Sequence, residues 1–176
     1  YGIPVSEKFK ENYYRLSHPT VEKNSKILEM SNYRRKKELL IMGGGLGVLP
    51  DNREFYEKLN ELDGVHTTIV AGNNKDLYNI LYNNYENITV LAYTDRVSEL
   101  MQDADCVVTK PGGITMFEAI YSLTPIVSFS TKLPNELKNI DFIQDNNLGI
   151  VLNESAEKSI ERIVRFVNND KRTDEV

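Results

Sequence analysis

The fold is decided by the stretch Val107–Glu118, which reads VVTKPGGITMFE. It passes from an apolar run through Lys-Pro-Gly-Gly into a pattern that is typical of a helix. The apolar run Cys106–Thr109 is too short for a helix and rich in valine, so it predicts a buried strand. The stretch therefore predicts a strand, a glycine-bearing turn and a helix in direct succession.

The same succession recurs along the chain on both sides of this stretch. The predicted strands are Leu39–Met42, Thr67–Ala71, Ile88–Ala92, Cys106–Thr109, Pro125–Phe129 and Gly149–Leu152. The predicted helices are Asn52–Leu62, Asn74–Tyr85, Arg96–Gln102, Ile114–Ser122, Glu136–Asp145 and Ser155–Asn168; Asp51 or Asn52, and Asn73, are N-cap types, and Ser155 opens the last helix. Strict alternation implies parallel strands with right-handed crossovers. We therefore expect an α/β fold with a doubly wound parallel sheet of about six strands.

Composition places the chain among ordinary globular domains. The 176 residues are 40% hydrophobic and 27% charged, and no apolar run approaches the length of a membrane span. The net charge of −5 argues against a nucleic-acid partner, although small phosphate ligands stay possible. Cys106 lies in an apolar run and is expected to be a buried packing thiol.

The first 37 residues fit the alternating pattern poorly. We interpret 1–37 as a segment that enters from an N-terminal domain, with GIPVSEKF extended, and 38–176 as the nucleotide-binding domain. The opening residues carry no initiator Met, which indicates a piece of a longer protein. The basic run Arg34–Lys37 has two interpretations: a solvated approach to the first strand, or a contact with anionic lipid.

Three polar or glycine-bearing loops follow predicted strands: GGGLG at 43–47, KPGGIT at 110–115 and KLPNELKN at 132–139. In an open parallel sheet, ligands bind at the carboxyl ends of the strands. The GGGLG loop has neither the spacing of a P-loop nor that of a dinucleotide fingerprint. We expect this loop either to admit a ligand closely or to be a plain turn.

The KPGGIT loop predicts an anion site. Gly112 and Gly113 would allow backbone conformations closed to other residues and let a ligand approach closely, and the helix near Ile114 would present free N–H groups, which suits a diphosphate. Thr115 and Glu118 share a helix face, so a carboxylate one turn deeper could accept both hydroxyls of a ribose. The alternative is a tight turn followed by a glutamate that merely suits a helix N-terminus.

No metal site or catalytic triad is predicted. The string Asp103-Ala104-Asp105 matches a metal-binding D-x-D pattern but precedes a strand, so we expect it at the edge opposite the ligand loops. His18 and His66 are far apart in the sequence, without further ligands at zinc spacing. No Ser-His-Asp or Cys-His set can be assembled.

Several motifs together resemble one known family. MGGGLG, LAYTDRVSELMQDADCVVTKPGGITMFEAI, TPIV and PNELKN are similar to the C-terminal domain of monogalactosyldiacylglycerol synthases and processive diacylglycerol glucosyltransferases. The resemblance implies the C-terminal half of a GT-B fold, in which two Rossmann-like domains face a cleft. It runs from GIPV to the last helix and is most specific over Tyr93–Asn139.

The resemblance also implies roles for individual residues around a UDP-sugar. Diphosphate contacts would come from Gly112, Gly113, Ile114 and Thr115, with help from Lys110; ribose contacts from Glu118; uracil contacts from Tyr93 and Thr94; and sugar contacts from Asn135, Glu136 and Asn139. Gly44 and Gly45 would face the cleft. Asn135 stands where the family commonly has glutamine, which leaves the identity of the donor sugar open.

The implied reaction is transfer of a hexose from a UDP-sugar to a diacylglycerol-type lipid, without a metal or other cofactor. The family supplies the base and most of the lipid surface from the N-terminal domain, so we expect this chain to bind UDP but not to turn over. The full-length protein would be cytoplasmic and peripheral to the membrane. Two alternatives are a UDP-N-acetylglucosamine 2-epimerase and a non-catalytic nucleotide-sugar-binding module.

Overall fold

A single parallel sheet forms the centre of the protein. The computed structural model describes residues 5–11, 36–50, 52–153 and 155–168. Its strands are β1 Lys37–Met42, β2 Val65–Val70, β3 Ile88–Leu91, β4 Cys106–Thr109, β5 Ile126–Phe129 and β6 Gly149–Leu152. They form one six-stranded sheet in the order β3-β2-β1-β4-β5-β6, with every neighbouring pair parallel. The predicted fold class and all six strands are confirmed.

Helices alternate with the strands as predicted. They are α2 Arg53–Asn60, α3 Lys75–Leu81, α4 Val97–Asp103, α5 Gly113–Tyr121, α6 Pro134–Asp145 and α7 Ala156–Val167. Asn52 caps α2 by accepting a bond from the Glu54 N–H, as expected. Asn74 rather than Asn73 caps α3, and Ser155 precedes α7 without a side-chain bond.

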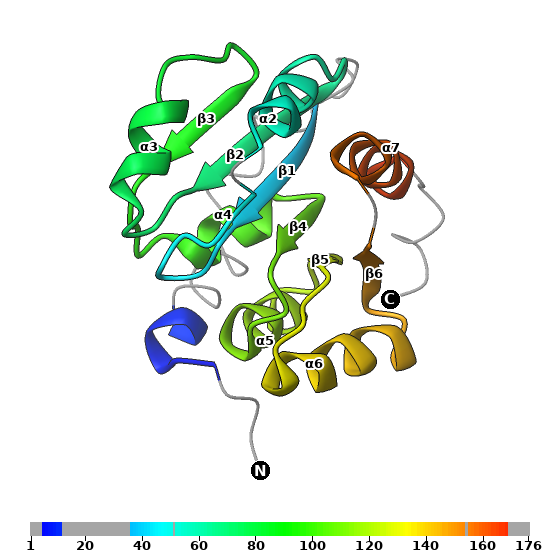
Figure 1. The fold of residues 1–176 in the computed structure, drawn as a ribbon. Helices are drawn as coiled ribbons and strands as arrows, with labels where there is room; N and C mark the ends of the chain where they lie inside the picture. Colours follow the sequence, from blue (N-terminus) through cyan, green and yellow to red (C-terminus); the bar gives the residue numbers. More distant parts are fainter. Residues whose placement is uncertain (1–4, 12–35, 51, 154, 169–176) are drawn as a thin grey trace, which may run out of the picture.

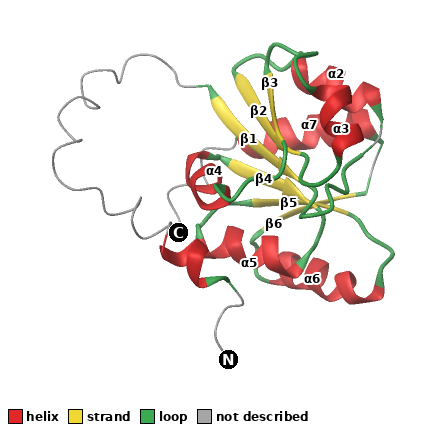
Figure 2. Ribbon diagram, turned by 90° about the vertical axis from the view of Figure 1, so that its left-hand side faces the viewer, coloured by secondary structure: helices red, strands yellow, loops and turns green. Residues whose placement is uncertain are grey.

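The helices cover both faces of the sheet and create two cores. Figures 1 and 2 show α2, α3 and α7 on one face and α4, α5 and α6 on the other. Phe55, Leu81 and Ile163 belong to the first core, whereas Met101 and Met116 belong to the second. The central strand β4 is buried at every residue, which explains its continuous apolar sequence.

The direction of winding reverses between β1 and β4. From β1 the chain proceeds outward through β2 to β3, and from β4 it proceeds in the opposite direction through β5 to β6. β1 and β4 are nevertheless paired in register, with Met42 beside Thr109. The GGGLG and KPGGIT loops therefore leave the sheet side by side, at the crevice where such folds bind ligands.

The N-terminal residues 5–11 pack against this domain. Residues 7–11 are helical, so the extended conformation expected for GIPVSEKF is wrong there; the Ser6 hydroxyl accepts a bond from the Phe9 N–H and starts the turn. Val5 and Phe9 are buried in the second core, and the Phe9 ring lies 6.3 Å from that of Tyr121. Residues 12–35, including His18, lie outside the described residues.

Candidate functional site

A pocket of about 570 Å³ opens at the carboxyl edge of the sheet, at the reversal point between β1 and β4. Every residue for which the sequence predicts a ligand contact lines this one pocket. They are Gly44, Gly45, Tyr93, Thr94, Lys110, Gly112, Gly113, Ile114, Thr115, Glu118, Asn135, Glu136 and Asn139. The structure thus brings together segments that are as far apart in the sequence as residues 44 and 139.

The first turn of α5 supplies backbone donors to this pocket. The helix begins at Gly113, its N-cap residue is Gly112, and no side chain caps it. The first backbone bond of the helix runs from the Met116 N–H to the Gly112 carbonyl, at 3.0 Å. The N–H groups of the residues between them precede that bond and carry the positive end of the helix dipole. This geometry suits an anion.

One of the two reasons predicted for the glycines of this turn is wrong. Gly112 has a φ of −77°, and neither Gly112 nor Gly113 belongs to the positive-φ glycines of the described chain, so the expectation of a glycine-only conformation is wrong. The other reason, close approach of a ligand, stays a prediction. The space at Gly113 is compatible with it, because a Cβ added there would meet only the Asn139 amide, at 3.9 Å.

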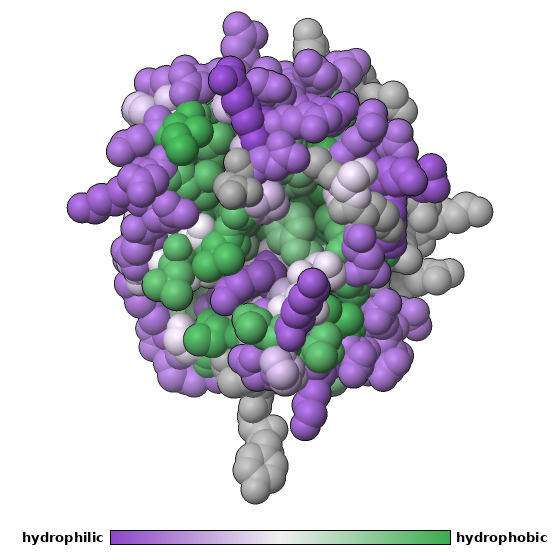
Figure 3. Space-filling view, in the orientation of Figure 1, coloured by the Kyte–Doolittle hydropathy of each residue, from purple (hydrophilic) through white to green (hydrophobic). Residues whose placement is uncertain are grey.

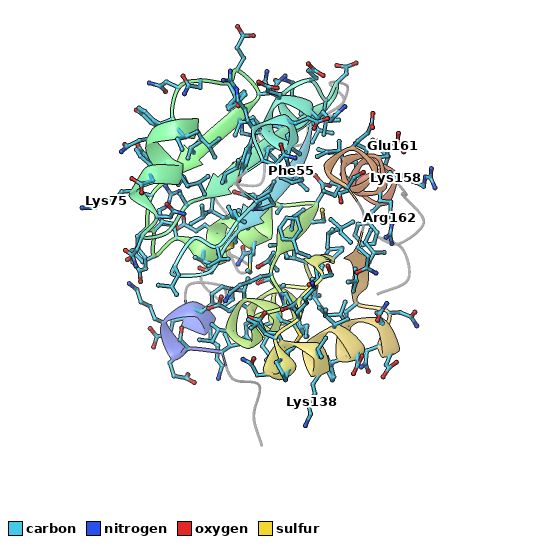
Figure 4. The ribbon with its side chains drawn as sticks, viewed as in Figure 1. Phe55, Lys75, Lys138, Lys158, Glu161 and Arg162 are labelled. Carbon is cyan, nitrogen blue, oxygen red and sulfur yellow. The ribbon has the colours of Figure 1, made fainter. Side chains whose placement is uncertain are left out.

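Helix α6 holds the turn in place from the other side. The Asn139 side-chain amide donates a 2.8 Å bond to the Pro111 carbonyl. One donor of Asn139 is therefore used within the protein, and its expected sugar contact stays a prediction. Lys138, one residue earlier, points away from the domain into solvent (Figure 4), whereas Glu136 and Asn139, three residues apart, share the face toward the pocket.

A charged cluster closes the α6 end of the pocket. Glu136 is only 7% exposed, and its carboxylate lies 3.4 Å from the Lys110 ammonium. The Thr131 hydroxyl donates a 3.0 Å bond to the other carboxylate oxygen and accepts one from the Leu133 N–H. Thr131 thus orients Glu136, a role that sequence reasoning missed because it depends on the loop conformation between β5 and α6.

Glu118 lies one turn into α5, beyond the buried Thr115. Partial burial raises the pKa of Glu118 to about 7, from an ordinary value of 4.5. Among the residues that the structure describes, none makes a hydrogen bond or ion pair with this carboxylate. A half-buried carboxylate with a raised pKa and no partner in a pocket is typical of a functional group. Tyr93, in contrast, is 67% exposed at the pocket.

The glycines of the GGGLG loop divide into two groups. Gly47 has a φ of +62°, and an added Cβ would overlap the Ala71 carbonyl, so this glycine is required by the backbone. The Asn74 amide donates to the Gly47 carbonyl at 3.1 Å and ties the loop to the start of α3. Gly45 has no atom within 4 Å of an added Cβ and faces the pocket. Both expected roles, turn and ligand approach, are thus compatible with one loop.

Four further pocket residues escaped the sequence analysis: Met42, Val70, Gly72 and Val97. Gly72 follows Ala71 just after the end of β2, and a Cβ there would lie 2.8 Å from the Gly44 carbonyl oxygen, so the loops after β1 and β2 touch. A glycine at the carboxyl end of a strand beside the reversal point was the signal that could have identified it.

The residues set aside by the sequence analysis lie away from this pocket. Asp105 precedes β4 and accepts a 2.8 Å bond from the Glu38 N–H, while His66 contacts Glu38 and Thr89. Cys106 is fully buried, and burial raises the pKa of its thiol. Across the described residues, no group of three metal-ligating side chains could hold an ion. None of the described helices combines the length and apolar character of a membrane span.

Comparison with known proteins identifies the family. The glycosyltransferase family 28 C-terminal domain matches residues 21–174. The chain belongs to this family. It is 35% identical over 160 residues to a Bacillus subtilis (strain 168) protein named processive diacylglycerol beta-glucosyltransferase, covering 89% of this chain and 40% of that protein. A Bacillus licheniformis protein of the same name is 31% identical, covering 99% of this chain and 44% of the relative.

Solved structures confirm the GT-B fold for this family 28 domain. MurG from Acinetobacter baumannii superimposes with a TM-score of 0.64 at 18% identity, over 81% of this chain and 46% of that one. A spinosyn rhamnosyltransferase complexed with thymidine diphosphate gives 0.61 at 16% identity, over 77% and 38%. The chain spans about two fifths of the length of the relatives that it matches. The match to the glycosyltransferase family model favours a transferase domain over the two alternatives, an epimerase and a non-catalytic module.

The two kinds of glycine in the GGGLG loop give a test of the loop's construction. Gly47→Ala is expected to lower the free energy of unfolding by about 1–3 kcal/mol, because it strains a left-handed conformation and overlaps the Ala71 carbonyl. Gly45→Ala, the matched control, is expected to change it by less than about 0.5 kcal/mol. Urea denaturation measures both, and equal stability of the two variants would contradict the division of roles.

The raised pKa of Glu118 predicts a pH-dependent stability. The native carboxyl keeps its proton up to about pH 7, whereas the unfolded one releases it near 4.5, so the contribution of Glu118 is fully present below pH 4.5 and lost as pH rises through 7. The side chain of Glu118→Gln cannot ionise. The free energy of unfolding of this variant, relative to wild type, is therefore expected to be higher at pH 8 than at pH 4. Urea denaturation across this pH range tests the expectation, with a substitution of the exposed Glu161, Glu161→Gln, as control (Figure 4). If the free energies of unfolding of wild type and Glu118→Gln change in parallel with pH, the burial of Glu118 is refuted.

Proposed function

We propose that this family 28 domain binds the UDP-sugar donor of a hexosyltransferase that acts on a diacylglycerol-type lipid. One observation carries the proposal: the uncapped start of α5 and the unpartnered Glu118 carboxylate face the same pocket. A row of N–H donors next to a carboxylate matches a diphosphate attached to a ribose. The diphosphate oxygens accept hydrogen bonds from the N–H groups, and the two ribose hydroxyls donate hydrogen bonds to the carboxylate.

The lining of the pocket suggests how the donor lies. We place the diphosphate over the N–H groups of Gly113, Ile114 and Thr115, and the ribose hydroxyls on Glu118. The uracil then extends toward Tyr93 and Thr94, at the start of the loop before α4.

The hexose occupies the opposite end of the pocket. Asn139 joins α6 to the diphosphate turn through Pro111, so the neighbouring Asn135 and Glu136 stand beside the phosphate that carries the sugar. A carboxylate held by Thr131 is a fixed acceptor for sugar hydroxyls.

The chemistry that these residues supply is stabilisation of the leaving group. When the bond between the sugar and the β-phosphate breaks, negative charge develops on UDP, and fixed backbone donors that need no reorganisation lower the energy of that state. Lys110 lies between the two glycine loops: its Cε is 3.4 Å from the position that an added Cβ would take at Gly44, and equally far from that at Gly112. Its ammonium is within reach of the same phosphate. No metal or other cofactor takes part in this proposal.

The lipid acceptor is proposed from the relatives, which are named as diacylglycerol glucosyltransferases. We assign the general base and most of the lipid surface to a further N-terminal domain, and we place the whole protein at the cytoplasmic face of a membrane. These assignments extend beyond the residues of this chain, which covers 40% of the first relative.

The ribose assignment predicts the effect of Glu118→Ala on UDP affinity. Removing a carboxylate that accepts two hydroxyl bonds is expected to cost roughly 1.5–3 kcal/mol. Because the ionised form binds the hydroxyls, wild-type affinity should rise with pH through 7, and Glu118→Gln should abolish that rise. Titration calorimetry measures both, with Glu161→Ala as control. An unchanged affinity in Glu118→Ala would eliminate the ribose role.

The assignment of the base predicts binding without turnover. We expect the 176-residue chain to bind UDP but to form no glycolipid from radiolabelled UDP-glucose and dioctanoylglycerol, because no residue of the donor pocket is assigned to deprotonate the acceptor. Calorimetry and thin-layer chromatography measure the two properties. Glycolipid formed by this chain alone would show that the base lies within it.

A further inference from the structure

A second pocket, of about 600 Å³, adjoins the donor pocket at the same edge of the sheet. Its walls come from the loop after β1, the carboxyl ends of β5 and β6, and the beginning of α6. Leu46, Val48, Phe129, Leu133 and Leu152 make most of these walls apolar. The sequence analysis found no sign of this pocket, because its apolar residues lie in four separate segments.

The rim of this second pocket exposes large apolar side chains. Leu46 is 75% exposed, Val48 55% and Leu133 54%, while Leu152 at the floor is buried. Hydrophobic residues gather around a hollow near the middle of the face shown in Figure 3. A group of exposed apolar residues around a concavity is typical of a binding site for an apolar ligand.

The two pockets share a polar wall. Lys110 and Glu136 line both of them, and Glu136 is the residue that we place beside the donor hexose. A molecule in the second pocket would therefore end next to the sugar that is transferred. An acceptor needs this position, because its hydroxyl must reach the anomeric carbon while its remaining part is held elsewhere.

We propose that the second pocket holds the first part of an acyl chain of the diacylglycerol acceptor, with the glycerol hydroxyl at the Lys110–Glu136 wall. This inference rests on the proposed function. It gives the donor-binding domain a share in acceptor recognition, in addition to the lipid surface assigned to the N-terminal domain. The continuity of the apolar pocket with the sugar end of the donor pocket selects a lipid chain as its occupant.

The test uses short-chain diacylglycerols that dissolve as monomers. In the presence of saturating UDP, we expect dihexanoylglycerol to bind the chain, and dibutyrylglycerol to bind more weakly by about fourfold for each methylene that leaves the pocket. Binding is followed by calorimetry. Affinity independent of chain length would overturn the proposal, because an apolar pocket must distinguish the two.

Variants locate the bound lipid. The double substitution Leu46→Gln/Leu133→Gln is expected to weaken dihexanoylglycerol at least tenfold and to leave UDP affinity unchanged, since neither residue lines the donor pocket. Ile80→Gln, on α3 and 61% exposed, is the matched control and should change neither affinity. Unchanged UDP affinity also shows that the double variant is folded.

The outcomes separate the two proposals. Binding of UDP without binding of dihexanoylglycerol, or lipid binding that survives the double substitution, overturns the second pocket and leaves the donor site intact. The exposed leucines would then be a surface for another domain. Failure of wild-type protein to bind UDP overturns the donor site, and the lipid proposal falls with it.

Discussion

The pairing of β1 with β4 is the constraint on which the site depends. The chain continues from β1 and from β4 toward opposite ends of the sheet, so none of the described connections runs between these two strands, and a crevice is left where they end, at Met42 and Thr109. The loops that follow both strands must then run side by side. The start of α5 emerges at this crevice with its N–H groups uncapped, and every other ligand-facing residue is arranged around it. A different strand order would keep the motifs and lose the pocket.

The proposed attraction of a diphosphate to an acidic protein would be local. The chain carries a net charge of −5, and among the described residues that line the pocket the one cation is Lys110, which is paired with Glu136. The backbone of α5 therefore supplies most of the favourable potential, and it acts over a single turn. We propose that Glu118 accepts the ribose hydroxyls, and its raised pKa reduces the negative charge that would oppose an incoming anion.

The sequence predicts local features of this protein well and long-range ones poorly. Strands such as Cys106–Thr109 were predicted to the residue because buried parallel strands are short, apolar and bounded by turns. Helix ends were predicted less accurately. Helix α3 ends at Leu81 instead of at Tyr85, and Asn83, between these two residues, adopts a φ of 58°. The Thr131 contact and the second pocket depend on loop geometry and on segments distant in sequence. Of the two reasons predicted for the glycine pair, only the unusual φ is wrong, since the sequence does not separate a need for space from a need for an unusual φ.

The shared wall of Lys110 and Glu136 suggests why the donor and acceptor would be handled by one surface. The distance of 3.4 Å between the Lys110 ammonium and the Glu136 carboxylate is long for a charged hydrogen bond. Lys110 would therefore lose little interaction energy if it turned toward a phosphate. Glu136 does not need Lys110 to stay in place, because Thr131 holds its second oxygen and is itself fixed by the backbone of Leu133. Donor binding would then free a carboxylate oxygen at the boundary between the two pockets without moving it. An oriented acceptor of hydrogen bonds at that point is what a sugar hydroxyl on one side and a glycerol hydroxyl on the other both require.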